Sequence, residues 1–224
     1  MKSIYTILTL LVTLSVFSQS AISLEVGDFN EVKVYDLIEI NLIPSSENKV
    51  IIKGDDTHFV KVVNKNGKLK IKMDLEKSFN GDQTFVEVYF KDLDIIDSNE
   101  GAYVVVNEMI EQNTIELRAQ EGGRIRVGLE VNHLKIKSVT GGIVEASGLA
   151  KSQEIKLNTG GIFEGRELRT MDTKLAITAA GEAEINASES VDVKLTAGGD
   201  VYIYGDPKKI QKRRLAGGRI KVMN

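Results

Sequence analysis

The chain has 224 residues, no cysteine and a formal net charge of −3 at pH 7. The lack of cysteine excludes disulfides, thiolate metal sites and the lipid attachment that bacterial lipoproteins make at a cysteine. The near-neutral charge argues against bulk binding of nucleic acid.

Residues 1–18 have the pattern of a secretory signal peptide. Lys2 supplies a positive start, an apolar stretch runs from Ile4 to Phe17, and Ser18 directly precedes a plausible cleavage site before Gln19. This stretch is short for a transmembrane helix, which needs about 20 apolar residues. We therefore expect export to the periplasm, the cell surface or the medium. We also expect one domain over residues 19–224, with no transmembrane segment once the signal is removed.

Residues 22–100 are rich in predicted strands but follow no fixed repeat. Asn66-Gly67 separates two of these strands and is a typical hairpin signal. We interpret this segment as the irregular first half of one body, with an antiparallel hairpin that caps it. A separate β-domain is the alternative. The expected strands cover residues 32–34, 38–42, 50–52, 59–63, 69–73 and 85–90.

Residues 101–224 repeat about every 19 residues. Each copy contains a pair of small residues whose second member is glycine, and Glu100-Gly101 is an earlier, looser copy. We expect these glycines at a tight corner, where a side chain would clash or φ must be positive. Small residues just before the pair, such as Thr140 and Thr159, fit the inside of such a corner. The corner glycines are Gly123, Gly142, Gly161, Gly181, Gly199 and Gly218.

Between the glycines, apolar residues alternate with a period of two, which is the period of a β-strand. Four columns share one parity and should point inward; one of them contains Ile125, Val144, Phe163, Ala183 and Val201. A fixed repeat with matching columns is typical of a solenoid in which each repeat forms one coil. The sequence therefore predicts an all-β fold, a parallel β-helix with coils of about 19 residues.

Several of these segments resemble the head-GIN-domain family, which is labelled as auto-transporter adhesins and is common among secreted proteins of Bacteroidetes-type bacteria. The resemblance implies a right-handed parallel β-helix, similar to pectin lyase but without its catalytic residues. A literal Gly-Ile-Asn is absent, and Gly142-Ile143 and Gly161-Ile162 come nearest. The segments that carry the resemblance are residues 29–34, 50–55, 66–71, 205–207 and 216–220.

No residue pattern predicts catalysis, a metal or a cofactor. His58 and His133 are far apart in the sequence and lack an evident set of partners. Asp55 and Asp56 resemble a carboxylate pair of some polysaccharide hydrolases, but such enzymes need further carboxylates in neighbouring coils. We expect these residues to be solvated turn or loop residues.

The outward columns carry the candidate binding surface. One column forms a basic ladder of four residues: Arg118, Lys137, Lys156 and Lys194. A second contains the run Glu145, Glu164 and Glu184, and a third alternates in charge. A row of cations spaced about 4.8 Å apart suits an anionic polymer.

These columns leave three functions open. The first is a non-catalytic binding or adhesion module for an extracellular or envelope polysaccharide or a surface protein. The second is a polysaccharide-processing enzyme, and the third is a purely structural envelope protein.

Overall fold

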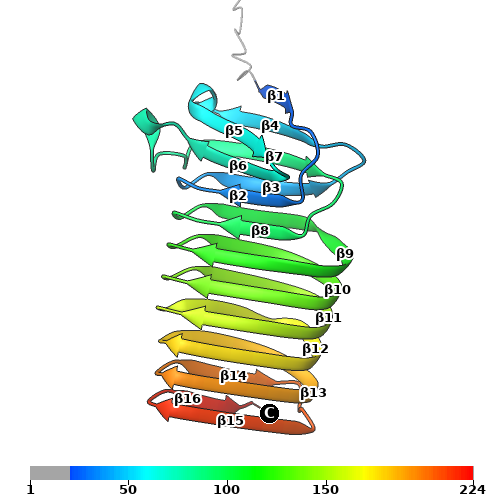
Figure 1. Cartoon of the computed structure of the whole chain (residues 1–224), viewed down its shortest axis with the longest axis vertical. Coiled ribbons are helices and arrows are strands. Elements are labelled where there is room, and N and C mark those ends of the chain that lie inside the picture. The colour runs from blue at the N-terminus through cyan, green and yellow to red at the C-terminus, as the bar shows by residue number, and fades with distance from the viewer. Residues whose placement is uncertain (1–20, 224) are drawn as a thin grey trace, which may run out of the picture.

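The protein is a β-solenoid of about seven turns in the computed structural model, which describes residues 21–223 (Figure 1). This confirms the predicted all-β class and the coil length of about 19 residues. The predicted signal peptide, residues 1–18, lies outside the described residues.

Short strands form the first part of the chain, whereas the second part consists of five long strands that each wrap most of a coil, followed by three short ones. The first part contains β1 (Ile22–Glu25), β2 (Glu31–Val34), β3 (Glu39–Pro44), β4 (Lys49–Gly54), β5 (Val60–Lys65), β6 (Lys68–Met73), β7 (Thr84–Phe90) and β8 (Ile95–Ser98), with 3-10 helices η1 (Thr57–Phe59) and η2 (Leu75–Lys77). The second contains β9 (Tyr103–Gln120), β10 (Arg124–Val139), β11 (Ile143–Asn158), β12 (Gly161–Ala179), β13 (Gly181–Ala197), β14 (Asp200–Tyr204), β15 (Lys209–Ala216) and β16 (Arg219–Val222).

Each regular coil has two flat sides that enclose one apolar core. In β10, Ile125 and Val127 are buried on the first side, the strand bends over residues 128–133, and Leu134 and Ile136 are buried on the second side. The next coil continues in parallel register, with Ile125 beside Val144 and Ile136 beside Ile155. The predicted inward columns are therefore correct through β13. Their outward neighbours lie on two opposite outer faces, which we call the first face (residues 124–127 and equivalents) and the second face (residues 134–139 and equivalents).

A tight turn joins the second side of each coil to the first side of the next. Thr140 and Gly141 both have positive φ, 51° and 71°, and Gly142 N donates to Val139 O at 3.0 Å, which together form a type I′ turn. A Cβ on Gly142 would lie 2.2 Å from the carbonyl oxygen of Ala119 in the preceding coil, so only glycine fits. Gly123 and Gly161 are equally confined, whereas Gly181, Gly199 and Gly218 have positive φ themselves.

The small residues before the glycine pair do not occupy the inside of a corner, contrary to the sequence prediction. Thr140 and Thr159 are exposed, because a residue in the left-handed region at the tip of the turn directs its side chain into solvent. Stacking of the turns holds this strained backbone: Thr140 N donates to Asn158 O at 3.2 Å, and Gly141 N donates to Thr159 O at 3.1 Å.

The first coils are stacked out of sequence order. β2 pairs in parallel with both β6 and β8, and β3 pairs in parallel with both β7 and β9. The coil formed by β2 and β3 therefore lies between the coil of β6 and β7 and the coil of β8 and β9 (Figure 1).

Antiparallel strands close this end of the solenoid. β5 and β6 form the hairpin predicted at Asn66-Gly67, and β4 pairs in antiparallel register with both β1 and β7. At the other end, β15 pairs only with β13, and β16 pairs only with β14, among the described residues. Lys212 and Arg214 fill the inward columns of this last coil, as expected from the sequence, and both are exposed.

Candidate functional site: two oppositely charged faces

The predicted basic ladder forms on the second face. Arg118 of β9 stands beside Lys137 of β10, which stands beside Lys156 of β11. Ala176 of β12 follows, and Lys194 of β13 lies one coil beyond it. Parallel pairing aligns these residues because each lies at the same distance from its glycine turn. The ladder therefore contains three adjacent cations and a fourth after a gap of one coil.

Two members of the ladder are already paired with carboxylates of their own strands. Arg118 Nε lies 2.7 Å from Glu116 Oε1, and this hydrogen bond raises the pKa of the guanidinium. Lys156 Nζ lies 2.7 Å from Glu154 Oε1, which lowers the pKa of Glu154 and raises that of Lys156. Lys137 and Lys194 are exposed, and neither forms an ion pair with any residue of the 21–223 range.

A row of alternating charge runs beside the ladder. Neighbouring coils place Glu116 beside Lys135, Lys135 beside Glu154, and Glu154 beside Lys174. A shallow depression of about 250 Å³ lies between the two rows and includes the side chains of Lys135 and Lys137. The coil of β10 thus contributes two lysines and no carboxylate to these rows, which makes it the most positive part of the face.

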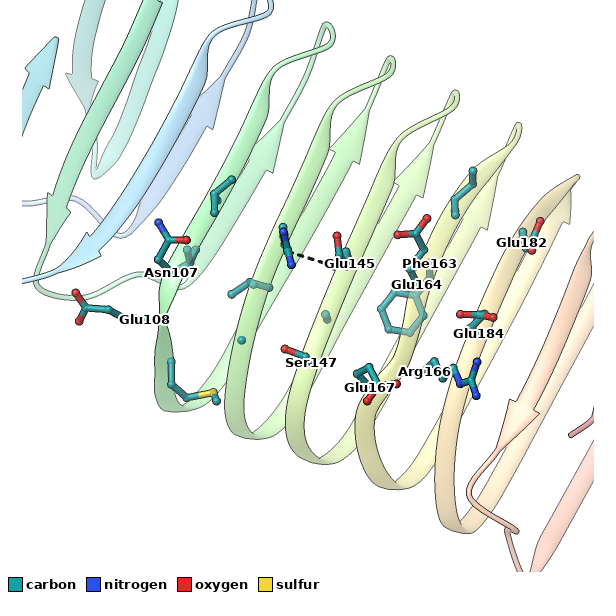
Figure 2. A pocket seen from close by; sticks show the side chains of 18 residues that line it. Asn107, Glu108, Glu145, Ser147, Phe163, Glu164, Arg166, Glu167, Glu182 and Glu184 are labelled. Carbon is teal, nitrogen blue, oxygen red and sulfur yellow. Dashed lines mark ion pairs between the residues drawn. The ribbon is translucent and has the colours of Figure 1, made fainter. Parts of the chain in front are cut away.

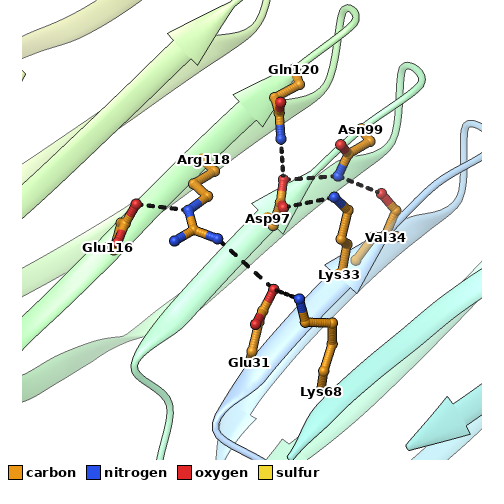
Figure 3. Close-up of polar contacts among 9 residues, drawn as sticks. All are labelled: Glu31, Lys33, Val34, Lys68, Asp97, Asn99, Glu116, Arg118 and Gln120. Atoms are coloured by element: carbon orange, nitrogen blue, oxygen red, sulfur yellow. Dashed lines mark hydrogen bonds and ion pairs between the residues drawn. The ribbon is translucent and has the colours of Figure 1, made fainter. Parts of the chain in front are cut away.

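Asp97 stands where a further ladder cation would lie, in the coil before Arg118. Its side chain is only 2% exposed and accepts hydrogen bonds from Asn99 Nδ2 at 2.9 Å and Gln120 Nε2 at 3.0 Å (Figure 3). Lys33 Nζ of β2 lies 3.1 Å from its other oxygen. Burial alone would lower the pKa of Lys33, but the hydrogen bond and charge of Asp97 outweigh it and raise that pKa. This clasp joins β2, β8 and β9 and ends the ladder at Arg118.

An acidic trough of about 910 Å³ lies on the first face, opposite the ladder (Figure 2). Its central row consists of Glu145, Glu164 and Glu184, which are register partners in β11, β12 and β13. Two arginines, Arg126 and Arg166, also line it. The remaining acidic side chains of the trough are Glu108, Glu167 and Glu182.

The trough's own contacts neutralise only part of this charge. Arg126 Nε lies 3.2 Å from Glu145 Oε1, and Arg124 Nη2 lies 3.8 Å from Glu164 Oε2. Tyr204 OH donates to Glu184 Oε1 at 3.2 Å; burial, followed by the charge of Glu184, raises the pKa of this phenol. No ion pair within residues 21–223 involves the other three glutamates, Glu108, Glu167 and Glu182.

Sequence reasoning identified the central glutamate row but not the trough. The hollow depends on the bend of β12, where the strand register shifts between Glu164 and Arg169. Gly165 lies against the ring of Phe163 there, and a Cβ at this position would lie 2.3 Å from two ring carbons. The extra residue of this 20-residue repeat was visible in the sequence, yet the wall formed by Arg166 and Glu167 appears only when neighbouring coils are stacked.

The two histidines lie apart in the fold. His133 has a hydrogen-bond partner that the sequence did not indicate, because its Nδ1 lies 2.8 Å from Ser152 Oγ of the next coil. A hydrolytic triad also needs a third group that orients the imidazole, and no carboxylate of residues 21–223 hydrogen bonds to it. In the described part of the chain, no group of three or more His, Asp or Glu residues could hold a metal ion.

Asp56, one of the two adjacent aspartates, forms an ion pair with Lys77 at 3.4 Å.

Within residues 21–223, no helix is long and apolar enough to cross a membrane.

Comparison with known proteins agrees with the resemblance seen in the sequence. Residues 28–207 match the family described as "putative auto-transporter adhesin, head GIN domain". A "putative adhesin" from Bacteroides fragilis has a similar structure, with a TM-score of 0.84, 19% identity, and coverage of 92% of this chain and 98% of that chain. A "putative lipid binding protein" from Parabacteroides distasonis gives a TM-score of 0.69 at 14% identity, covering 92% and 97% of the two chains.

A "putative adhesin" from Parabacteroides merdae gives a TM-score of 0.68 at 16% identity, covering 92% of this chain and 96% of that chain. At these identities the solved structures show a shared fold alone. Among curated proteins, no significant match is found.

Proposed function

Because this chain belongs to the head GIN domain family of auto-transporter adhesins, we propose that it is an exported, non-catalytic binding module that holds an anionic polysaccharide along its second face. The observation that carries the proposal is the register of the basic ladder. Lys137 stands directly beside Arg118 and Lys156, so three successive coils each present one cation, about 4.8 Å from the next.

The cations without a partner in the described chain supply most of the attraction. Lys137 and Lys194 of the ladder are exposed, and Lys135 and Lys174 of the neighbouring row add charge beside them. Each exposed contact with a carboxylate or sulfate is weak, about 0.2–1 kcal/mol. Affinity therefore comes from many simultaneous contacts with one polymer and falls with salt, since the Debye length is about 8 Å at physiological ionic strength.

The aromatic side chains favour a charged over a neutral sugar ligand. A cation lies over each of three tyrosine rings, and the distances run from the cationic atom to the ring centroid. Arg166 Cζ lies 4.8 Å from Tyr204, and Lys221 Nζ lies 5.7 Å from Tyr202. Arg124 Cζ lies 5.9 Å from Tyr103. These rings lie on the first face, and cations occupy the ring surfaces on which a neutral sugar would stack. The second face offers ammonium groups instead.

The test is retention on immobilised polygalacturonate and on heparin. The ladder variant Lys137→Gln/Lys156→Gln/Lys194→Gln should keep its melting temperature and lose retention at physiological salt. The control variant Lys65→Gln/Lys91→Gln/Lys151→Gln removes the same charge from exposed positions away from the ladder and should elute with the parent protein.

Equal elution of the ladder variant and the parent protein on both columns would refute polyanion binding at this face. Release of reducing ends or unsaturated sugars from the same polymers, with or without calcium, would instead favour the enzymatic alternative. No retention of the parent protein at low salt would favour a purely structural envelope protein.

A further inference from the structure

We propose that copies of this protein associate side by side, with the basic ladder of one copy seated in the acidic trough of the next. This inference goes beyond the proposed polysaccharide binding, although the two share the ladder. It rests on three features of the trough and the ladder: their charge, their repeat and their shape.

The charges are opposite and lie on opposite sides of the same coils. Six glutamates and two arginines line the trough. On the second face, the four ladder cations and the two lysines of the neighbouring row outnumber the carboxylates of Glu116, Glu154 and Asp192. Two copies placed in the same orientation therefore bring a positive face against a negative one.

The spacing between successive charges is the same on the two faces, because the stacking distance between coils sets both. Glu145, Glu164 and Glu184 follow one another once per coil through β11, β12 and β13. The ladder cations follow the same coils on the other side, with Lys156 in β11 and Lys194 in β13. A different cationic polymer would bind well only if its charges were also spaced about 4.8 Å apart. A second copy of this protein has this spacing because its coils stack at the same distance.

The shapes are also complementary. The trough spans β9 to β13, and Glu108 of β9 and Glu167 of β12 line it beside the bends of these strands (Figure 2). The ladder lysines are exposed side chains on the second face and are aligned along the same stacking direction. Flexible ammonium groups that enter the acidic trough can reach its glutamates.

Contacts within the described residues leave three glutamates of the trough without a cation. Arg126 lies 3.2 Å from Glu145, Arg124 lies 3.8 Å from Glu164 and 3.9 Å from Glu145, and both arginines are exposed. Glu182, Glu108 and Glu167 make no ion pair with residues 21–223. The second copy would supply the cations that these carboxylates lack.

Two different surfaces in contact make the assembly open-ended. Each copy uses its ladder toward one neighbour and its trough toward another, so the arrangement does not close at a dimer. Association should grow with protein concentration and disappear at high salt, since these exposed charges are screened within a few ångströms at about 1 M ionic strength.

The test is sedimentation velocity at low and at high salt with two neutralised variants. The ladder variant Lys137→Gln/Lys156→Gln/Lys194→Gln keeps its trough, and the trough variant Glu145→Gln/Glu164→Gln/Glu184→Gln keeps its ladder. The parent protein should form species larger than a dimer at low salt and monomers at high salt. Each variant alone should remain monomeric, and an equimolar mixture should form one-to-one dimers that grow no further.

The control variant Lys65→Gln/Lys91→Gln/Lys151→Gln should associate like the parent protein. A parent protein that stays monomeric at low salt, or a variant that still associates alone, would overturn the inference. Failure here is distinguishable from failure of polysaccharide binding, because the trough variant should keep full retention on polygalacturonate and heparin while losing self-association.

Discussion

The out-of-order coils before residue 101 and the regular coils after it both stack by parallel strand pairing but are held together differently. The regular coils stack apolar columns, and none of their buried side chains is charged among the described residues. The first part buries two carboxylates, Asp36 at 3% exposure and Asp97 at 2%. In the regular half, the same turn leads each coil directly onto the one before it. The β2–β3 coil instead lies between coils that come later in the sequence, so specific side-chain contacts are needed to hold it.

Asp36 shows how such a contact works. Its carboxylate accepts hydrogen bonds from Met73 N and Phe79 N, each at 3.0 Å, and from Ser78 Oγ at 3.1 Å. These donors lie about 40 residues later in the chain, at the end of β6 and in the loop before β7. The buried carboxylate is therefore hydrogen bonded to three donors and ties the β2–β3 coil to the coil beside it.

The largest expected effect breaks the apolar stacking of the regular half. Phe163 is fully buried beside Gly165, as the sequence predicted. Loss of the ring alone costs about 3–5 kcal/mol, and Phe163→Asp adds an unpaired buried charge. This variant should unfold several coils. Thermal melting should show a loss of many degrees, or no folded protein at all.

The control for this variant is the adjacent outward residue. Glu164→Ala removes a side chain that is 43% exposed and should change stability by no more than about 0.5 kcal/mol. Equal melting temperatures for the two variants would contradict the inward and outward assignment of the coil.

A smaller effect should appear at the clasp between the two regions. Asp97→Ala leaves Lys33 and the amides of Asn99 and Gln120 without their acceptor, which should cost about 3 kcal/mol, the lower end for a broken buried pair. Lys33 keeps some access to water, so the upper end is not expected. Hydrogen exchange should accelerate in β2 and β8 and remain slow in β11 to β13.

The matched change is Lys61→Gln, which removes the exposed ion pair with Asp74 at 3.6 Å and should cost at most about 1 kcal/mol. Uniform acceleration of exchange along the whole solenoid in Asp97→Ala would mean that the two regions unfold as one unit. Such a result would contradict the view that side-chain contacts hold the first coils separately from the regular ones.

The smallest effect concerns a titration on the second face. Lys156 lowers the pKa of Glu154 from its ordinary value of 4.5, first through the hydrogen bond and then through its charge. A lowered folded-state pKa contributes stability above the unfolded-state pKa, and this stability is lost as pH falls through the folded-state pKa. Lys156→Gln should therefore raise the pKa of Glu154 and reduce the acid sensitivity of the fold below about pH 4.5.

Carboxyl-carbon NMR titration of Glu154 measures this shift directly. Lys151→Gln, an exposed change in the same coil, should leave the titration where it is in the parent protein. An unchanged pKa in Lys156→Gln would show that the ion pair does not persist in solution, and Lys156 would then count as a free member of the ladder.

How much the sequence predicts differs between the two regions for a physical reason. The columns of Leu117, Ile136 and Ile155, and the ladder outside them, follow from strand alternation and a 19-residue repeat, because parallel stacking keeps equal positions side by side. The hairpin at Asn66-Gly67 is equally local and was found. The place of β2 and β3 between later strands was not, since no local pattern encodes which distant strands pair.

The amino-acid sequence by itself determined the β-solenoid, the buried columns, the turns at the glycine pairs and the alignment of Arg118, Lys137 and Lys156. These features need only the alternation of a strand and a constant repeat. The tertiary structure alone decided the stacking order of the first coils, the clasp around Asp97, the partner of His133 and the acidic trough. Each of these depends on side chains from different coils meeting in space, where register shifts, bends and burial act together.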